Sequence, residues 1–386
     1  MGDCFTERVE SMPDGELISV TINDGIKKFS ELGRHDNSND DKSKYKKVCV
    51  GDIAYNSMRM WQGASGYSSY EGIVSPAYTV LSPNSGINSK CLAYQFKLPE
   101  MIHTFQVNSQ GITSDNWNLK YPVLSKIEIF VSKDEQEQAK IAEYFENLDN
   151  LITLHQRKYD KLTNVKKSML EKMFPKNGSN VPEIRFKGFS DAWEQRKLGE
   201  RMYIKSRVGW QALTKNEYMT TGDYYLITGT DIDPNHTVDL SRSYYVSKER
   251  YEMDTNIQVK NGDIIITKDG TIGKVAMISG LDKPATLNSH LFVLRDESGE
   301  LDNNFFLQLL CSHIFEQFVE SVKTGSTLTG LPQKTIVEFK FLYPSLEEQQ
   351  KIGAYFSQLD NLITLHQREL EKLKNLKKAC LEKMFV

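Results

Sequence analysis

Apolar side chains recur with a period of seven in two long stretches of the chain, residues 138–174 and 349–385. Both stretches are rich in Leu, Lys, Glu, Gln and Ala, and neither contains a proline. This pattern predicts two amphipathic helices, each roughly 55 Å long at about 1.5 Å per residue, which pair along one seam. We place the seam at these residues: Ile141, Leu148, His155, Leu162 and Met169 in the first helix, and Ile352, Leu359, His366, Leu373 and Cys380 in the second.

The two stretches are copies of one another. Of 37 aligned positions 25 are identical, at an offset of 211 residues. A Gly-Asp-Ile triplet that begins at Gly51 returns at Gly262 with the same offset, so the whole unit is duplicated. The pseudo-two-fold symmetry of such a repeat favours antiparallel packing of the two helices into a coiled-coil spacer, with a parallel pair as the alternative.

The midpoint of each helix carries a histidine on the seam, His155 and His366. In an antiparallel pair the two side chains would approach each other. They could then form a pH-sensitive or metal-binding pair, or they could be neutral histidines hydrogen-bonded to neighbouring polar groups. The second interpretation is the simpler one, and we expect no metal site.

The remaining residues form two bodies with a mixed strand and helix pattern. In the second body, DIIIT, KVAMI, HLFVLR and IVEFKFLYP indicate strands, and residues 305–322 indicate a helical stretch. In the first body, residues 91–105 indicate helix, and KIEIFV at 126–131 indicates a strand. We therefore predict a mixed α+β fold with two α/β domains separated by the helix pair. The predicted boundaries are 1–132, 133–175, 176–345 and 346–386.

Composition and motifs narrow the function. The 386 residues carry a net charge of −3, and no apolar run is long enough to span a membrane. The acidic, polar N-terminus is not a signal peptide, and the five scattered cysteines show no metal-ligand spacing, so we expect a reduced, cytoplasmic protein. The spacings of phosphate loops, dinucleotide-binding loops, nucleophile elbows and zinc proteases are all missing. The sequence thus predicts a non-catalytic chain without cofactors.

Polar, basic and aromatic residues gather on the glycine-rich loops of both bodies. Side chains of these types read base edges and hold phosphates in protein–DNA interfaces. The candidate DNA-binding residues are Asn56, Arg59, Trp61, Gln62, Gln110 and Asn116 in the first body, and Lys268, Thr271, Lys274, Lys323, Ser326, Thr327 and Lys334 in the second.

Three segments resemble a known family. The tail LEEQQKIGAYFSQLDNLITLHQR, the segment IRFKGFSDAWEQRKLGE at 184–200, and GDIAYNSMRMWQGASG are similar to the specificity subunits of type I restriction–modification systems. The resemblance implies that each body is a target-recognition domain for one half of a split double-stranded DNA site. It also implies that the helices dock two methyltransferase subunits, that restriction subunits join this core, and that catalysis lies in the other subunits. A chain of the same build with degenerate bodies, acting only as an assembly scaffold without DNA affinity, is the alternative.

The first body departs from the repeat at its start. We call residues 184–200 the lead segment, because they introduce the second body. No such residues introduce the first body, in which Met1-Gly2-Asp3 aligns with Leu198-Gly199-Glu200. This departure puts the outer strand of the first body in question, and with it the docking of one methyltransferase copy.

Overall fold

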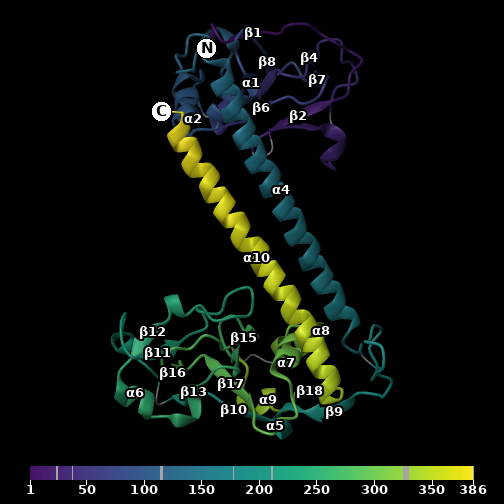
Figure 1. Cartoon of the computed structure of the whole chain (residues 1–386), viewed down its shortest axis with the longest axis vertical. Helices are drawn as coiled ribbons and strands as arrows, with labels where there is room; N and C mark the ends of the chain where they lie inside the picture. The colour runs from purple at the N-terminus through teal and green to yellow at the C-terminus, as the bar shows by residue number, and fades with distance from the viewer. Residues whose placement is uncertain are drawn as a thin grey trace. The chain divides into compact units, whose positions relative to one another are not determined.

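The computed structural model describes residues 1–22, 25–36, 38–113, 116–176, 178–209, 212–324 and 330–385. The chain divides into two compact units, whose elements are labelled in Figure 1. Unit 1 comprises Met1–His155 with Glu369–Val386, and unit 2 comprises Gln156–Arg368. Each unit is a β-rich body joined to parts of two long helices, α4 (Glu135–Lys172) and α10 (Leu346–Met384). The predicted mixed α+β class is therefore confirmed.

Unit 1 contains a four-stranded antiparallel sheet in the order β1-β8-β5-β6 and two strand pairs, β2 with β3 and β4 with β7. Its strands are β1 (Phe5–Glu7), β2 (Ile18–Thr21), β3 (Gly25–Lys28), β4 (Lys46–Val48), β5 (Ile53–Asn56), β6 (Ser65–Tyr67), β7 (Gly72–Val74) and β8 (Tyr78–Pro83). Its helices besides the long pair are α1 (Ser89–Gln95), α2 (Pro99–Asn108) and α3 (Tyr121–Leu124).

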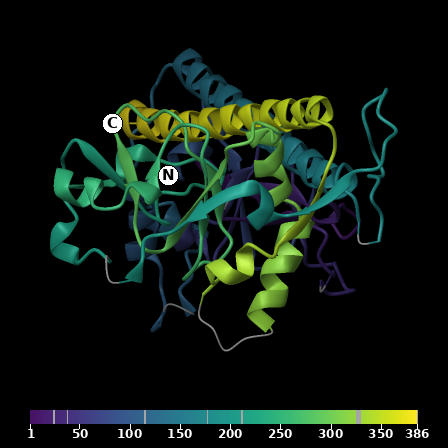
Figure 2. The same cartoon turned by 90° about the horizontal axis from the view of Figure 1, so that it is seen from below.

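Unit 2 contains two four-stranded sheets, ordered β10-β17-β14-β15 and β12-β11-β16-β13, and the pair β18 with β9. Figure 2 shows these strands beside the helix α10, drawn in yellow. The strands are β9 (Glu194–Lys197), β10 (Met202–Lys205), β11 (Tyr224–Ile227), β12 (Tyr244–Val246), β13 (Gln258–Val259), β14 (Ile264–Thr267), β15 (Val275–Met277), β16 (Ala285–Leu287), β17 (Leu291–Asp296) and β18 (Lys340–Tyr343). The short and middle-length helices are α5 (Leu198–Arg201), α6 (Lys248–Glu252), α7 (Asn303–Leu310), α8 (His313–Thr324) and α9 (Gln333–Ile336).

The first sheet of unit 2 repeats the sheet of unit 1. In unit 1, β8 pairs with β1 on one side and with β5, the strand after the Gly-Asp-Ile turn, on the other. In unit 2, β17 pairs in the same way with β10 and β14. All four pairs are antiparallel. The sequence repeat therefore extends to the topology of the bodies, although their sequences differ.

The long helices run antiparallel where they meet inside each unit. In unit 1, Tyr144 Oη lies 3.4 Å from Cys380 Sγ, and Lys377 Nζ lies 2.5 Å from Asp149 Oδ1. In unit 2, Lys166 Nζ lies 2.6 Å from Asp360 Oδ1, and the rings of Phe174 and Phe356 are 6.2 Å apart. In both places the residue number falls along one helix as it rises along the other, so the antiparallel prediction is confirmed within each unit.

A buried glutamine near the start of each long helix fastens that helix to its body. Gln138 and Gln349 are repeat counterparts, and each side chain accepts one backbone N–H and donates to two backbone carbonyls. The partners are Asn88 N, Gly86 O and Ser132 O for the first, and Asp302 N, Glu300 O and Pro344 O for the second. Because the partners are backbone atoms, the bodies can differ in sequence and keep the same attachment.

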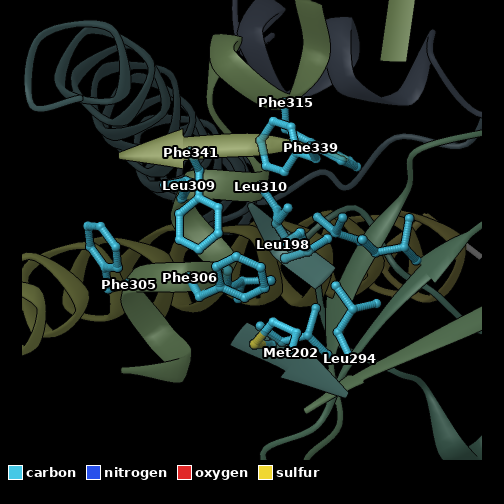
Figure 3. Close-up of a cluster of buried hydrophobic side chains, with 14 of the residues drawn as sticks. Leu198, Met202, Leu294, Phe305, Phe306, Leu309, Leu310, Phe315, Phe339 and Phe341 are labelled. Atoms are coloured by element: carbon cyan, nitrogen blue, oxygen red, sulfur yellow. The ribbon is translucent and has the colours of Figure 1, made fainter. Parts of the chain in front are cut away.

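An aromatic core fills the space between α7, α8 and the strands of unit 2 (Figure 3). The rings of Phe306 and Phe341 are tilted against each other with their centroids 5.6 Å apart, and Leu198 and Leu294 are also fully buried. Burying such side chains contributes roughly 1.5–3 kcal/mol each. This core holds the strands from which the candidate loops of unit 2 project.

Two expectations about local structure need correction. Residues 126–131 are all described, yet they form no strand, and none of the described residues pairs with them in a ladder. The helical stretch at 305–322 is interrupted at Cys311 and Ser312, where the Ser312 hydroxyl donates to Leu309 O at 2.6 Å, and α8 begins at His313.

Candidate nucleic-acid interface

The Gly-Asp-Ile triplet forms the turn that precedes the candidate loop in each body. Gly51 has a φ of 96°, a left-handed value that favours glycine. The next residue, Asp52, is buried, accepts the Cys49 N–H at 2.8 Å, and pairs through both oxygens with Arg8 at 2.7 and 3.0 Å. A buried, doubly bonded carboxylate of this kind fixes the turn, and so it aims the strand and loop that follow.

Unit 2 uses the same turn. Gly262 has a φ of 93°, and Asp263 accepts the Lys260 N–H at 2.8 Å. Its two oxygens accept from Arg295 at 2.8 and 2.6 Å. In the sequence, both aspartates stood out only as part of the repeated Gly-Asp-Ile triplet. The arginines were missed, because Arg8 lies before its aspartate in the chain and Arg295 lies after it.

The candidate loops of unit 1 come together beyond the end of the inner strand β5. Asn56 ends β5 and its side chain accepts the Met58 N–H at 3.0 Å, which starts a turn carrying Arg59, Trp61 and Gln62. Arg59 Nη1 donates to Gln62 Oε1 at 3.2 Å, and Arg59 is exposed. An exposed guanidinium on a fixed turn suits bidentate contact with a base or a phosphate.

A second loop packs against this turn. Gln110 and Asn118 exchange two backbone hydrogen bonds of 2.9 and 2.8 Å, which close the loop that carries Asn116. The adjacent Trp117 meets Trp61 edge to face, with the ring centroids 5.3 Å apart. The structure therefore brings all six candidates of the first body into one surface. We call it loop surface 1: Asn56, Arg59, Trp61, Gln62, Gln110, Asn116 and Trp117.

Two residues of this region were missed from the sequence. Trp117 had no signal beyond its aromatic side chain, and Ile112 is 99% exposed at the same loop. A fully exposed isoleucine on a polar loop is a side chain able to contact the methyl group of thymine or the sugar edge.

In unit 2 the loop between β14 and β15 is held from three sides. The Lys268 N–H donates to His290 O at 2.9 Å, and Lys268 O accepts the Leu331 N–H at 2.5 Å. Asp269 Oδ1 lies 2.5 Å from His290 Nδ1. Lys268 is half-buried, and its Nζ lies 3.4 Å from Ser206 Oγ. Thus Lys268 ties the loop to the body, whereas Thr271 and Lys274 are exposed beyond it.

The other candidates of unit 2 are placed only in part. Lys334 is exposed in α9, next to Gln333, whose side chain donates to Ile204 O at 2.9 Å. The backbone of Lys323 belongs to α8, but its side chain lies outside the described part of the structure, as do Ser326 and Thr327. We call the exposed set Thr271, Lys274 and Lys334 loop surface 2.

Acidic groups lie beside Lys274. This lysine lines a pocket of about 610 Å³ together with Asp233, Glu316 and Glu320. Carboxylates that line the same pocket repel a phosphate, so we expect Lys274 to contribute less to contact with the DNA backbone than Arg59. Within the described ranges, no group of three or more His, Cys, Asp or Glu side chains is placed to hold a metal ion.

Lys97, a lysine beneath loop surface 1, has a lowered pKa. Lys97 Nζ donates to Gly63 O at 2.6 Å and to Ile22 O at 3.1 Å. Burial, with a smaller contribution from the Lys377 charge, lowers the pKa of Lys97 from 10.5 to about 8. At pH values between these two pKa values, Lys97 is protonated in the unfolded chain and has released its proton in the folded chain.

The contribution of Lys97 to the free energy of unfolding should therefore rise from pH 8 to pH 10.5. Burial of Cys91 raises its pKa to about 11 and acts in the opposite direction, so the comparison requires a variant. Urea unfolding of the wild type and of Lys97→Met across this range isolates the effect. We expect the free energy of unfolding to rise less with pH in the variant than in the wild type. If the two free energies depend on pH in the same way, the assignment to Lys97 is wrong.

All ten predicted seam residues are half-buried or buried in their own units. Leu148, Ile352 and Leu359 are buried, and His155 and His366 are half-buried. The other five, half-buried, are Ile141, Leu162, Met169, Leu373 and Cys380.

Apolar residues beside the seam remain exposed at matching positions. Leu151 and Leu154 of α4 are exposed in unit 1, and their repeat counterparts Leu362 and Leu365 of α10 are exposed in unit 2. A pair of exposed leucines one turn apart on a helix marks a surface suited to another helix. None of the helices within the described ranges has the length and apolar character needed to cross a bilayer.

Comparison with known proteins gives a consistent result. The family described as type I restriction modification DNA specificity domain matches residues 21–164 and 190–375. The specificity subunit of the type I restriction enzyme MjaVIII from Methanocaldococcus jannaschii is 25% identical over 358 residues, which cover 87% of this chain and 80% of that protein. The putative MjaX specificity subunit of the same organism is 24% identical over 380 residues, covering 93% and 83%.

Solved structures share the fold. The S subunit of the type I restriction–modification system from M. genitalium superposes with a TM-score of 0.61 at 16% identity, covering 100% of this chain and 94% of that one. A chain from a structure of type I restriction–modification complex assembly and conformational transition gives 0.50 at 17% identity, covering 99% and 94%.

Proposed function

The chain belongs to the family of type I restriction–modification specificity subunits, and from this membership we propose that its two bodies each read one half of a bipartite double-stranded DNA site. As a specificity subunit it is the non-catalytic DNA specificity component of a type I restriction–modification system. We propose that the protein acts in the cytoplasm, where the DNA of a prokaryotic cell is accessible.

The repeated loop position is the observation that carries the two-reader proposal. The same Gly-Asp turn and Asp–Arg pair stand before the loop of β5 in unit 1 and the loop of β14 in unit 2. The frame is therefore the same, whereas the loop residues differ: Arg59 and Trp61 in one, Thr271 and Lys274 in the other. A shared frame with different exposed side chains supports two readers with different targets.

Replacing Arg59 by alanine should change the reading of one half-site only. A bidentate base contact is worth about 1–3 kcal/mol, so discrimination in that half should fall about tenfold or more. Binding of the assembled complex to duplexes randomised in one half at a time measures this. The exposed Lys133, replaced by alanine, is the control and should leave both preferences intact. Equal loss in both halves would contradict the assignment.

A salt series tests whether the chain reads DNA at all. Contacts with phosphates release counterions, so the logarithm of the binding constant should fall steeply with the logarithm of salt concentration. A flat response of the assembled complex would instead favour a scaffold whose bodies have no DNA affinity. The net charge of −3 makes this test necessary, because binding must rest on local patches.

The two exposed leucine pairs support docking of two methyltransferase subunits, with restriction subunits joining that core. The pairs are equivalent by sequence repeat and are both solvent-exposed, as two equal docking sites require. Left uncovered, they should also make the isolated chain prone to aggregation.

Charged residues at one leucine pair should remove one methyltransferase copy. Leu151→Glu with Leu154→Glu, and separately Leu362→Glu with Leu365→Glu, should each reduce the stoichiometry from two to one, because a charge cannot be buried unpaired. Native mass spectrometry of the co-purified complex measures this. Asn147→Glu and its repeat counterpart Gln358→Glu, both at exposed positions, are the matched controls. Retention of two copies by both leucine variants would reject this docking surface.

A further inference from the structure

Unit 2 holds a second cavity, of about 560 Å³, which shares no residue with loop surface 2. Its walls come from the chain after α4, the lead segment, α8 and β18. Trp193 N donates to Asn180 O at 2.8 Å, and Gln195 lies opposite Leu342 in the antiparallel ladder of β9 and β18, so backbone hydrogen bonds fix two of the walls. We call it the β9–β18 cavity, and the lining residues that matter most are Asn180, Trp193, Gln195, Ile314, Lys340 and Leu342.

The lining of the β9–β18 cavity is positively charged. It includes two lysines, Lys176 and Lys340, and within the described part of the chain no carboxylate lines it. Lys176 Nζ is paired with Glu183 at 3.2 Å, whereas Lys340 is exposed and forms no ion pair with any described residue. The carboxylate of Glu338 lies within electrostatic range of Lys340, but it already accepts from Lys197 Nζ at 2.8 Å. The cavity therefore favours an anion.

Trp193 supplies a buried donor that has no acceptor. The residue is only 3% exposed, and its ring packs edge to face on Phe174 and Phe305, with centroids 6.0 and 5.7 Å apart. Neither phenylalanine lines the cavity, so Trp193 forms the boundary between this aromatic cluster and the cavity. Its Nε1 is buried and meets no acceptor among the described residues. A buried N–H left unpaired costs about 1–3 kcal/mol, and a ligand oxygen in the cavity would remove that cost.

The rest of the lining combines amide and apolar side chains. Asn180 and Gln195 are exposed, and their amide groups can each donate and accept a hydrogen bond. Ile314 and Leu342 are half-buried and contribute apolar surface. Cavities of roughly 300–1,000 Å³ that combine apolar walls with a few polar groups are typical of sites for small organic molecules. A bare phosphate or carboxylate would leave most of this volume empty, so the ligand should also have an uncharged part.

We propose that the β9–β18 cavity binds a small organic oxyanion, in which a carboxylate or phosphate group is joined to an apolar part. Lys340 pairs with the anion, Trp193 Nε1–H donates to one of its oxygens, and Ile314 and Leu342 contact the apolar part. Because the lining comes from the lead segment, α8 and β18, the bound ligand joins these elements and stabilises unit 2. This site does not depend on the reading of DNA by either body.

The indole N–H signals of the full chain, labelled with ¹⁵N at tryptophan, test the proposal by NMR. The chain has four tryptophans, and Trp193→Phe identifies the signal of Trp193. Titration with phenyl phosphate or benzoate should shift this signal saturably and leave the other three in place, because only this N–H gains a charged acceptor. The tighter of the two probes identifies the class of anion. Inorganic phosphate should bind about tenfold more weakly than phenyl phosphate, because it lacks the apolar part.

A lysine variant tests the charged contact. Lys340→Met should weaken binding of the better probe about tenfold or more, because a charge-assisted hydrogen bond is lost. Lys187→Met is the matched control: Lys187 is exposed in the lead segment and does not line the cavity, so this variant should bind the probe as the wild type does. A Trp193 signal that neither organic probe shifts, equal shifts of all four indole signals, or unchanged affinity in Lys340→Met would overturn the proposal.

Discussion

Inserting one heptad into each long helix should lengthen the non-specific gap of the recognised DNA site by about three base pairs and leave both half-sites unchanged. Seven helical residues rise about 10.5 Å, and base pairs are about 3.4 Å apart. Lys166 faces Asp360 in unit 2, so the position after Arg157 faces the position after Arg368, and insertion there keeps both exposed leucine pairs. Inserting seven residues at both positions preserves the seven-residue period of the seam and its pairing.

Mapping methylated positions in the genome of cells that carry this variant gives the half-sites and the gap in one measurement. A variant with the insertion after Arg157 only is the control; it puts the two helices out of register and should lose activity. New half-site bases with the original gap would reject the helices as the spacer.

Replacing Glu348 by alanine should lower the free energy of unfolding of unit 2 by about 3–5 kcal/mol. Its carboxylate is fully buried and accepts from Nε and Nη2 of Arg185, whose side chain is only 12% exposed. Removal of one partner leaves a buried guanidinium without its counter-charge, which is the costly case for an ion pair. Hydrogen exchange in the peptides of α10 and the lead segment measures the loss in unit 2 separately from unit 1.

The repeat supplies the matched control. Glu137 occupies the same place in unit 1 and is exposed, so Glu137→Ala should change stability by less than about 0.5 kcal/mol. A large effect at both positions, or at neither, would contradict the difference in burial that separates the two units.

The helices and the internal repeat could be predicted because their signals are local. A seven-residue apolar period is contained in the stretch that forms the helix, and α4 and α10 begin three residues before the repeated blocks. The strands β14, β15 and β17 were equally predictable from short apolar runs between turn residues.

Features that depend on distant residues could not be predicted. Arg8 and Asp52 are 44 positions apart, and nothing in either neighbourhood marks the pair. Trp61 meets Trp117 only because two loops far apart in the sequence fold together beyond the end of β5. Residues 126–131 have the alternation of a strand, but a strand needs a partner, and alternation carries no information about its presence.

The two buried glutamines, Gln138 and Gln349, have a consequence for how such a protein can change. Each attaches its helix to its body through backbone atoms alone, so the attachment does not depend on which side chains the body carries. A body of different sequence that presents the same backbone groups keeps these hydrogen bonds, whereas contacts such as those of Lys90 with Glu146 and of Tyr94 with Asp149 depend on side chains of the body. Exchange of a body between two chains of this build would therefore preserve the anchoring of the helix and require adjustment only of the side-chain contacts along it.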